Sequence, residues 1–195
     1  MYYNEFIILM GERVIMNYVQ PIRAKAVIDD MKIELMKNNY RDYFLFIIGI
    51  NTGFRVSDIL ELKVSDVKGG QHIIIKEKKT GKTKRAYVSK QLKKDIDKYT
   101  ANMGENEYLF PSQKGNKPIG RVQAYRILNN AAKKVGLDEI GTHTLRKTFG
   151  YWHYKQHKDV AVLQELFNHS SPSITKLYIG IRQDEIDNTM KDFYL

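Results

Sequence analysis

The C-terminal part of the chain contains two histidines, an arginine and a tyrosine whose spacing suits phosphoryl chemistry. His143 and Arg146 lie three residues apart, so on a helix both project from one face and can reach one phosphate. His169 follows between two segments that read as helices, and Tyr178 comes nine residues later. Far upstream, Arg55 stands at the start of another expected helix. Phosphodiester cleavage without a metal needs a nucleophile, cationic donors for the phosphorane charge and a proton donor, and these residues offer candidates.

Each of these residues also has an ordinary structural interpretation. An H-x-x-R string most often lies on a solvated helix face, and a lone arginine is usually a surface residue. The sequence has 13 tyrosines, each of them by default a structural aromatic, so only position separates Tyr178 from Tyr151 and Tyr154. The functional interpretation therefore rests on the whole set occurring together and in order.

Charge and cysteine content limit the classes of partner. Lys and Arg number 32 against 22 Asp and Glu, a net charge of +10, so the folded surface should attract a polyanion, nucleic acid above all. A protein that is merely basic is the alternative. The absence of cysteine excludes disulfides, thiolate catalysis and cysteine-ligated metal sites. A chain without disulfides is consistent with a reducing cytosol. The apolar runs Phe6–Met10 and Tyr43–Ile50 are too short to span a bilayer, so we expect a cytoplasmic protein without a membrane partner.

The elements that must position these side chains are mostly helical. Hydrophobic patterning predicts helices over Ile22–Asn38, Tyr40–Asn51, Arg55–Leu62, Lys90–Tyr99, Arg121–Val135, Thr142–His157, Val160–Phe167, Ser173–Ile179 and Asp184–Phe193. The expected caps are Gly53, Ser89, Gly136, Asp159 and either Ser171 or Ser173. Two stretches rich in β-branched and aromatic residues, His72–Lys76 and Lys84–Val88, flank a Lys-Lys-Thr-Gly-Lys segment and predict a hairpin with lysines at its tip. We expect a mainly α domain with one small antiparallel β-sheet, an α+β fold.

Three segments resemble sequence boxes of the tyrosine recombinases, or phage integrases, which share a catalytic core with type IB topoisomerases. Residues 52–62, Thr-Gly-Phe-Arg-Val-Ser-Asp-Ile-Leu-Glu-Leu, are similar to T-G-x-R-x-S-E-x-L-x-L, with Asp58 in the acidic position. Residues 143–150 resemble H-x-L-R-H-T-F-A, and residues 166–171 resemble L-L-G-H-S-S, with Asn168 where glycine is common. Tyr178 then arrives at the family's usual interval. The resemblance covers roughly residues 20–190 and implies the fold of that catalytic core.

The resemblance implies a role for each of these candidate residues. Tyr178 attacks the scissile phosphate, forming a 3′-phosphotyrosyl bond and releasing a 5′-hydroxyl. Arg55 and Arg146 hold the non-bridging oxygens with charged, bidentate geometry that lysine cannot reproduce. His169 adds a hydrogen bond to the same phosphate, and His143 is the general base toward the tyrosine or a proton relay.

The lysine-rich hairpin tip is where the family carries a mobile catalytic lysine. Lys79 takes that position and would protonate the departing 5′-oxygen, although a slip of a few positions would put Lys76, Lys78 or Lys82 there instead. Asp58 is interpreted as support for the site. The residues expected to contact the DNA backbone are Lys76, Lys78, Lys82, Lys84, Arg85, Arg121, Arg126 and Lys147.

The resemblance also implies partners and a domain plan. The partner is double-stranded DNA, and cleavage needs neither a metal nor another cofactor. Four protomers on DNA are expected, with a monomer free in solution. Residues 20–195 are interpreted as the catalytic domain, whose tail, residues 180–195, either docks on a neighbouring protomer or packs on its own chain. Residues 1–19 are interpreted as an extension, with Met16 as an alternative start to Met1, and no N-terminal core-binding domain is expected.

Site-specific DNA recombination by a bacterial or phage-encoded enzyme is the function that the resemblance implies, whether integration, inversion or resolution. Relaxation of supercoils, as type IB topoisomerases perform it, is a second enzymatic interpretation. A DNA-binding regulator that retains the fold without catalysis is a third. A covalent protein–DNA adduct separates the enzymes from the regulator, and joint products from two duplexes separate recombination from relaxation.

Overall fold

The computed structural model describes residues 19–138, 140–141 and 143–194. The predicted extension over residues 1–19 lies almost wholly outside the described residues, as does the alternative start at Met16. In chain order the elements are α1 (Lys25–Asn38), α2 (Tyr40–Thr52), α3 (Val56–Ile59), α4 (Val64–Val67), β1 (His72–Lys76), β2 (Thr83–Tyr87), α5 (Lys90–Tyr99), α6 (Arg121–Lys134), α7 (Thr144–His157), α8 (Val160–Phe167), α9 (Pro172–Tyr178) and α10 (Ile181–Met190). The expected α+β fold, mainly helical with one small antiparallel sheet, is confirmed.

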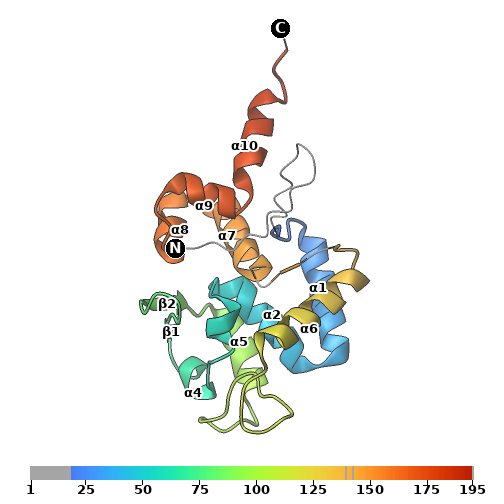
Figure 1. Cartoon of the computed structure of the whole chain (residues 1–195), viewed down its shortest axis with the longest axis vertical. Coiled ribbons are helices and arrows are strands. Elements are labelled where there is room, and N and C mark those ends of the chain that lie inside the picture. Colours follow the sequence, from blue (N-terminus) through green and yellow to red (C-terminus); the bar gives the residue numbers. More distant parts are fainter. Residues whose placement is uncertain (1–18, 139, 142, 195) are drawn as a thin grey trace, which may run out of the picture.

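Helix α2 runs through the centre of the main core. Its sequence is apolar on most sides, and side chains such as Phe44 and Ile48 are completely buried. Helices α1, α5, α6 and α7 all contact it, as the lower part of Figure 1 shows for the first three. At Gly49 the missing side chain lets α7 come close, since a Cβ there would overlap Leu145. This close approach brings the first turn of α7 beside the C-terminal end of α2.

A second, smaller core joins α7 to α8 and α9. It contains Tyr151, Leu163, Phe167 and Ile179, and Gly150 on α7 allows both Phe167 and Ile179 to approach the helix backbone. Helix α8 is capped by Asp159, as predicted, whose carboxylate accepts from two backbone N–H groups. Of the two serines considered for α9, Ser171 is the cap, and the helix begins at Pro172.

Strands β1 and β2 form an antiparallel hairpin that packs on the main core through one face. The register pairs His72 with Tyr87 and Lys76 with Thr83, so β2 begins one residue earlier than predicted. Ile73, Ile75 and Ala86 are buried on the inner face. We call residues 77–82, which join the strands, the hairpin turn. Its closing hydrogen bonds run from Glu77 N to the Lys82 carbonyl, 2.9 Å, and from Gly81 N to the Glu77 carbonyl, 2.8 Å.

Helix α10 extends away from the rest of the molecule, at the top of Figure 1. The helix predicted over Asp184–Phe193 instead spans Ile181–Met190 and buries only Ile181. Glu185 ties it to the body by accepting from the Tyr154 hydroxyl, 2.5 Å, and from the Lys176 ammonium, 2.8 Å. Within the part of the chain that the structure describes, no helix has the length and apolar character needed to cross a membrane.

Candidate active site

Arg146 is the most firmly held of the predicted site residues. It lies in the first turn of α7 and is only 4% exposed. Its guanidinium donates to the Gly53 carbonyl at 2.7 Å and to the Phe167 carbonyl at 3.2 Å, and its central carbon lies 4.5 Å from the centroid of the Phe167 ring. Gly53 ends α2 in the left-handed conformation, as predicted, with a φ of 64°. Because a guanidinium has five N–H donors, this anchoring leaves donors for a phosphate.

Arg55 is held differently, by a carboxylate rather than by backbone. It stands at the N-terminus of α3 and donates to Glu77, which follows the last residue of β1 and is 1% exposed. The same carboxylate accepts from the Thr80 hydroxyl at 2.6 Å. Glu77 therefore connects the first arginine of the site to the hairpin turn.

Tyr178 is the last residue of α9 and faces the two histidines. Its hydroxyl oxygen lies 3.3 Å from Nδ1 of His143, and its ring packs edge-on against His169, with centroids 5.0 Å apart. Desolvation raises the pKa of the Tyr178 phenol to about 12, against the opposing effect of the charges on Arg146 and Arg55. The phenol is therefore protonated at neutral pH and needs a base in order to act as a nucleophile.

His143 is placed to be that base. It precedes α7 as the N-cap instead of lying within the helix, which begins at Thr144. Desolvation lowers the pKa of His143, and the positive charges of Lys147 and Arg146 lower it further. A histidine with a pKa below its ordinary value is neutral at pH 7, so its free ring nitrogen can accept a proton from Tyr178.

His169 occupies the short connection between α8 and α9. Its Nδ1 lies 3.0 Å from the Thr175 hydroxyl, which donates in turn to the Ser171 carbonyl at 3.2 Å. Desolvation, followed by the charges of Arg146 and Arg55, lowers the pKa of His169 to about 4. The imidazole is therefore neutral at pH 7 in the protein alone.

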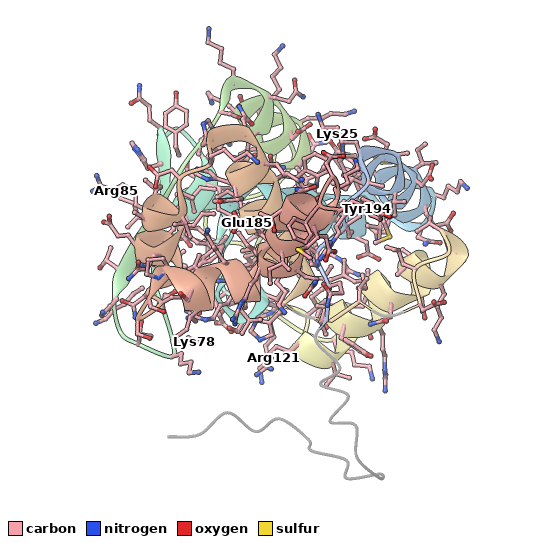
Figure 2. The ribbon with its side chains drawn as sticks, turned by 90° about the horizontal axis from the view of Figure 1, so that it is seen from above. Lys25, Lys78, Arg85, Arg121, Glu185 and Tyr194 are labelled. Carbon is pink, nitrogen blue, oxygen red and sulfur yellow. The ribbon has the colours of Figure 1, made fainter. Side chains whose placement is uncertain are left out.

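A cavity of about 940 Å³ brings together four of the six predicted catalytic residues, without His169 and Tyr178. Its lining includes Arg55, Lys78, Lys79, Arg121, His143 and Arg146, which come from α3, the hairpin turn, α6 and the start of α7. Figure 2, seen from above, shows Lys78 and Arg121 at the same edge of the molecule, with Arg85 farther round on the hairpin. The cavity is strongly cationic, as a phosphate site requires.

Asp58 lies beneath the hairpin turn and is buried. One carboxylate oxygen accepts from the backbone N–H of Lys78 at 3.2 Å, and the other has no hydrogen-bond partner among the described residues. The Lys78 ammonium forms an ion pair with Glu61 at 2.8 Å. Asp58 thus helps to place the turn that carries Lys79.

The eight residues expected to contact DNA do not form one surface. Lys76, Arg85, Arg121 and Arg126 are exposed, and of these only Arg121 lines the cavity. Arg126 lies on α6, five residues from Arg121 along the helix, away from the cavity lining. These assignments stay predictions.

Lys147 differs from the other lysines in that group because it is buried. Its ammonium lies 5.0 Å from the centroid of the Tyr178 ring, which places it against the face of that ring. Lys82 and Lys84 also contact protein, at the C-terminal end of α8: Lys82 donates to the Asn168 side chain at 2.6 Å and Lys84 to the Glu165 carbonyl at 2.8 Å.

The sequence matches a known family over most of its length. The family model described as "Phage integrase family" matches residues 19–185. The chain belongs to the phage integrase family. It is 53% identical over 178 residues to the probable integrase/recombinase YoeC of Bacillus subtilis, which covers 91% of this chain and 98% of YoeC. It is 29% identical over 154 residues to the tyrosine recombinase XerA of Pyrococcus horikoshii, of which it spans 54%.

Solved structures of tyrosine recombinases have the same fold. XerH bound to palindromic difH in a post-cleavage complex matches with a TM-score of 0.72 and 19% identity, over 93% of this chain and 55% of that one. The catalytic domain of bacteriophage HP1 integrase matches with a TM-score of 0.61 and 20% identity, over 89% and 95%. The expected catalytic-core fold is confirmed, and the chain spans about half the length of the Xer proteins that it matches.

Two of the residues that position this integrase-family site were not identified from the sequence. Glu77 had one available signal, because it continues the inward-facing alternation of Ile73 and Ile75 and is therefore a charged residue at a buried position. Thr175 had none, since its contact with His169 depends on how α9 turns back toward α8.

Proposed function

We propose that this protein is a site-specific DNA recombinase whose nucleophile is Tyr178. The observation that carries the proposal is the 3.3 Å separation between the Tyr178 hydroxyl and Nδ1 of His143, beside two arginines that separate elements hold in place. Residues 20–195 are assigned as the catalytic domain, and we place the protein in the cytoplasm, where its DNA substrates lie.

Cleavage then proceeds in one displacement at phosphorus. The Tyr178 oxygen forms a bond to the phosphorus while its proton passes to His143. The bond from phosphorus to the 5′-oxygen breaks, and the Lys79 ammonium supplies the proton that completes the 5′-hydroxyl. Rejoining is the reverse, with a 5′-hydroxyl of the partner strand attacking the phosphotyrosine, so neither ATP nor a metal ion enters the balance.

The two arginines bind the non-bridging oxygens of the phosphate. Both are held by contacts within the protein, so little side-chain entropy is lost when the phosphate arrives. The incoming anion also raises the pKa of His169, because a negative charge favours the imidazolium. We therefore expect His169 to become a charged donor only when DNA is bound.

Double-stranded DNA is the proposed partner, and strand exchange between two duplexes requires several protomers. The net charge of +10 and the cationic cavity support DNA binding. The similar XerH structure is bound to a difH substrate, and the similar lambda integrase structure is bound to a core site. We propose four protomers on DNA and a monomer in solution. The tail, residues 180–195, is the proposed contact between protomers, since Ile186 and Met190 of α10 are exposed.

Relaxation of supercoils and regulation without catalysis remain rival functions. A regulator has no need of a tyrosine, a base and two arginines held together, so the intact site disfavours regulation. Relaxation uses the same cleavage chemistry but only one duplex, so the products decide between it and recombination.

Adduct capture tests the proposal even though the target site is unidentified. Duplexes randomised around a nick are incubated with the protein, and DNA that stays attached in SDS is sequenced. We expect wild-type protein to enrich one sequence and Tyr178→Phe to retain none. Failure of the wild type to retain any duplex would overturn the proposal. Two labelled copies of the recovered site should then yield joint products, whereas plasmid relaxation without joint products would favour the topoisomerase alternative.

A further inference from the structure

The hairpin turn is attached to the opposite wall of the site by two lysines. Lys82 donates to the side-chain oxygen of Asn168 at 2.6 Å, and Lys84 donates to the Glu165 carbonyl at 2.8 Å. Both acceptors lie at the C-terminal end of α8, where the helix dipole places partial negative charge that favours a lysine. We call these two contacts the hairpin latch.

Asn168 has a backbone conformation that few residues adopt. It is the C-cap of α8, with φ 56° and ψ 48°, in the left-handed region where glycine is the default and asparagine is tolerated. Its neighbours on both sides belong to the site, because the Phe167 carbonyl accepts from Arg146 and His169 follows directly. With asparagine here, the junction keeps its turn and gains a side chain that reaches the hairpin.

At its other end the latch is close to Lys79. The Lys82 carbonyl accepts from Glu77 N, and the Thr80 hydroxyl donates to the Glu77 carboxylate, so the turn from residue 77 to residue 82 is internally bonded. Lys79 lies within that turn and lines the cavity with Arg55 and Arg146. Fixing Lys82 therefore limits where the Lys79 ammonium can lie.

We infer that Asn168 is a positioning residue that acts through Lys82 to hold Lys79 toward the leaving 5′-oxygen. The inference rests on the proposed function, in which Lys79 is the general acid. An exposed hydrogen bond of this kind contributes little to overall stability. Proton transfer is far more sensitive to geometry, because displacement of a reacting group by an ångström can cost about a hundredfold in rate. The latch should therefore affect the rate much more than the melting temperature.

Two substitutions at position 168 separate the side chain from the backbone. Asn168→Gly keeps the left-handed turn and removes the acceptor, whereas Asn168→Asp keeps an acceptor and adds a charge that pairs with Lys82. Single-turnover cleavage is measured at saturating concentrations of the site recovered by adduct capture. One version of the duplex has the natural 5′-oxygen at the scissile phosphate, and the other has a bridging 5′-sulfur. Sulfur leaves as a thiolate and needs no proton donor.

On the oxygen duplex we expect Asn168→Gly to cleave about tenfold more slowly than wild type, a fraction of the loss for removing a general acid outright. On the sulfur duplex it should match wild type, and Asn168→Asp should match wild type on both. In a Lys82→Met background, Asn168→Gly should cause no further slowing. Wild-type rates for Asn168→Gly on oxygen, equal slowing on both duplexes, or a full additional loss in the Lys82→Met background would each overturn the inference.

Lys79→Ala separates a failure of the latch from a failure of the proposed function. If Lys79→Ala is slow on oxygen and restored on sulfur while Asn168→Gly behaves as wild type, the inference alone is overturned. If Lys79→Ala is equally slow on both duplexes, Lys79 is not the acid, and the inference is overturned together with that part of the proposed function. A wild-type protein that forms no adduct overturns both.

Discussion

The two sides of the candidate active site differ in how firmly their side chains are held. On the helical wall, comprising Arg146, His169 and Tyr178, the two other residues are half-buried, whereas Arg146 is buried and held by two backbone carbonyls. The hairpin turn is exposed apart from Glu77, and it carries Lys79 on a two-stranded sheet, a unit that is marginal by itself. The arginine proposed to bind phosphate on this wall is therefore held in place by the protein itself, whereas the proposed proton donor depends on a few side-chain contacts.

Arginine-to-lysine substitutions should show the largest effect of how each side chain is held. Arg146→Lys loses the planar donors that reach Gly53 and Phe167, so we expect cleavage to fall by about a hundredfold to a thousandfold, as when a charge-stabilising donor is removed. Arg55→Lys can keep its ion pair with Glu77 and should lose less. Single-turnover adduct formation measures both. Equal losses would show that backbone anchoring of Arg146 is unimportant.

The pH dependence of stability should also distinguish the wall from the hairpin. The pKa of His169 is lowered to about 4. Below pH 6.5 this histidine therefore binds a proton in the unfolded chain, but in the folded protein it does so only near pH 4. Stability is thus lost as the pH falls through this range. We expect wild type to lose roughly 2 kcal/mol more than His169→Gln between pH 7 and pH 4, less than the full lowering of this pKa would give, because His169 is only half-buried.

Urea titrations at the two pH values measure that difference, and Lys79→Gln is the hairpin control. This control changes the hairpin turn and leaves His169 in place, so it should lose as much stability as wild type does. Parallel curves for wild type and His169→Gln would contradict the assignment of a low pKa to His169.

The junction of α2 with the helical wall should be intolerant of side chains. At Gly53, φ is +64° and a Cβ would lie 2.5 Å from the Phe149 ring. Gly136 has a similar φ of +75°, but nothing lies within 4 Å of its Cβ position. We therefore expect Gly53→Ala to lower the free energy of unfolding by about 2 kcal/mol and Gly136→Ala by about 1 kcal/mol, since left-handed strain is common to both. Denaturant melts check the difference, and equal costs would remove the steric explanation.

The smallest expected effect is a change in the salt dependence of DNA binding when a hairpin lysine is replaced. Lys76 is exposed at the end of β1, so Lys76→Gln should remove one phosphate contact and reduce the slope of log binding constant against log salt by about one. Titration of a labelled duplex at several salt concentrations gives the slope. An unchanged slope would mean that this face of the hairpin does not reach the DNA.

Much of the fold was predictable because it depends on signals between residues close together in the sequence. Helical periodicity, the glycine at the end of α2 and the cap at Asp159 are short-range signals, and they placed the main helices. The short helix α4 was missed, since four residues carry too little pattern. Helix α10 was shifted because its surface has almost no amphipathic pattern and only Ile181 is buried.

The candidate site was likewise predictable only in part. Arg55, His143, Arg146, His169 and Tyr178 could be found because they occur in ordered boxes. The contact that anchors Arg146 to the Gly53 carbonyl could not, because it joins residues 93 positions apart. Lys82 and Asn168 are separated by 86 positions, and nothing local indicates that a hairpin lysine meets the end of α8. Lys147 was predicted at the DNA surface, yet its burial against the Tyr178 ring follows only from how α7 packs against α9.

Mapping the covalent adduct tests the central assignment most directly. Protein trapped on the nicked duplex is digested with nuclease and trypsin, and the modified peptide is sequenced by mass spectrometry. Trypsin should release residues 177–182 as one peptide, because it cleaves after Lys176 and after Arg182. We predict a nucleotide attached to Tyr178 in that peptide. A nucleotide on Tyr151 or Tyr154, or an adduct that persists in Tyr178→Phe, would contradict the assignment.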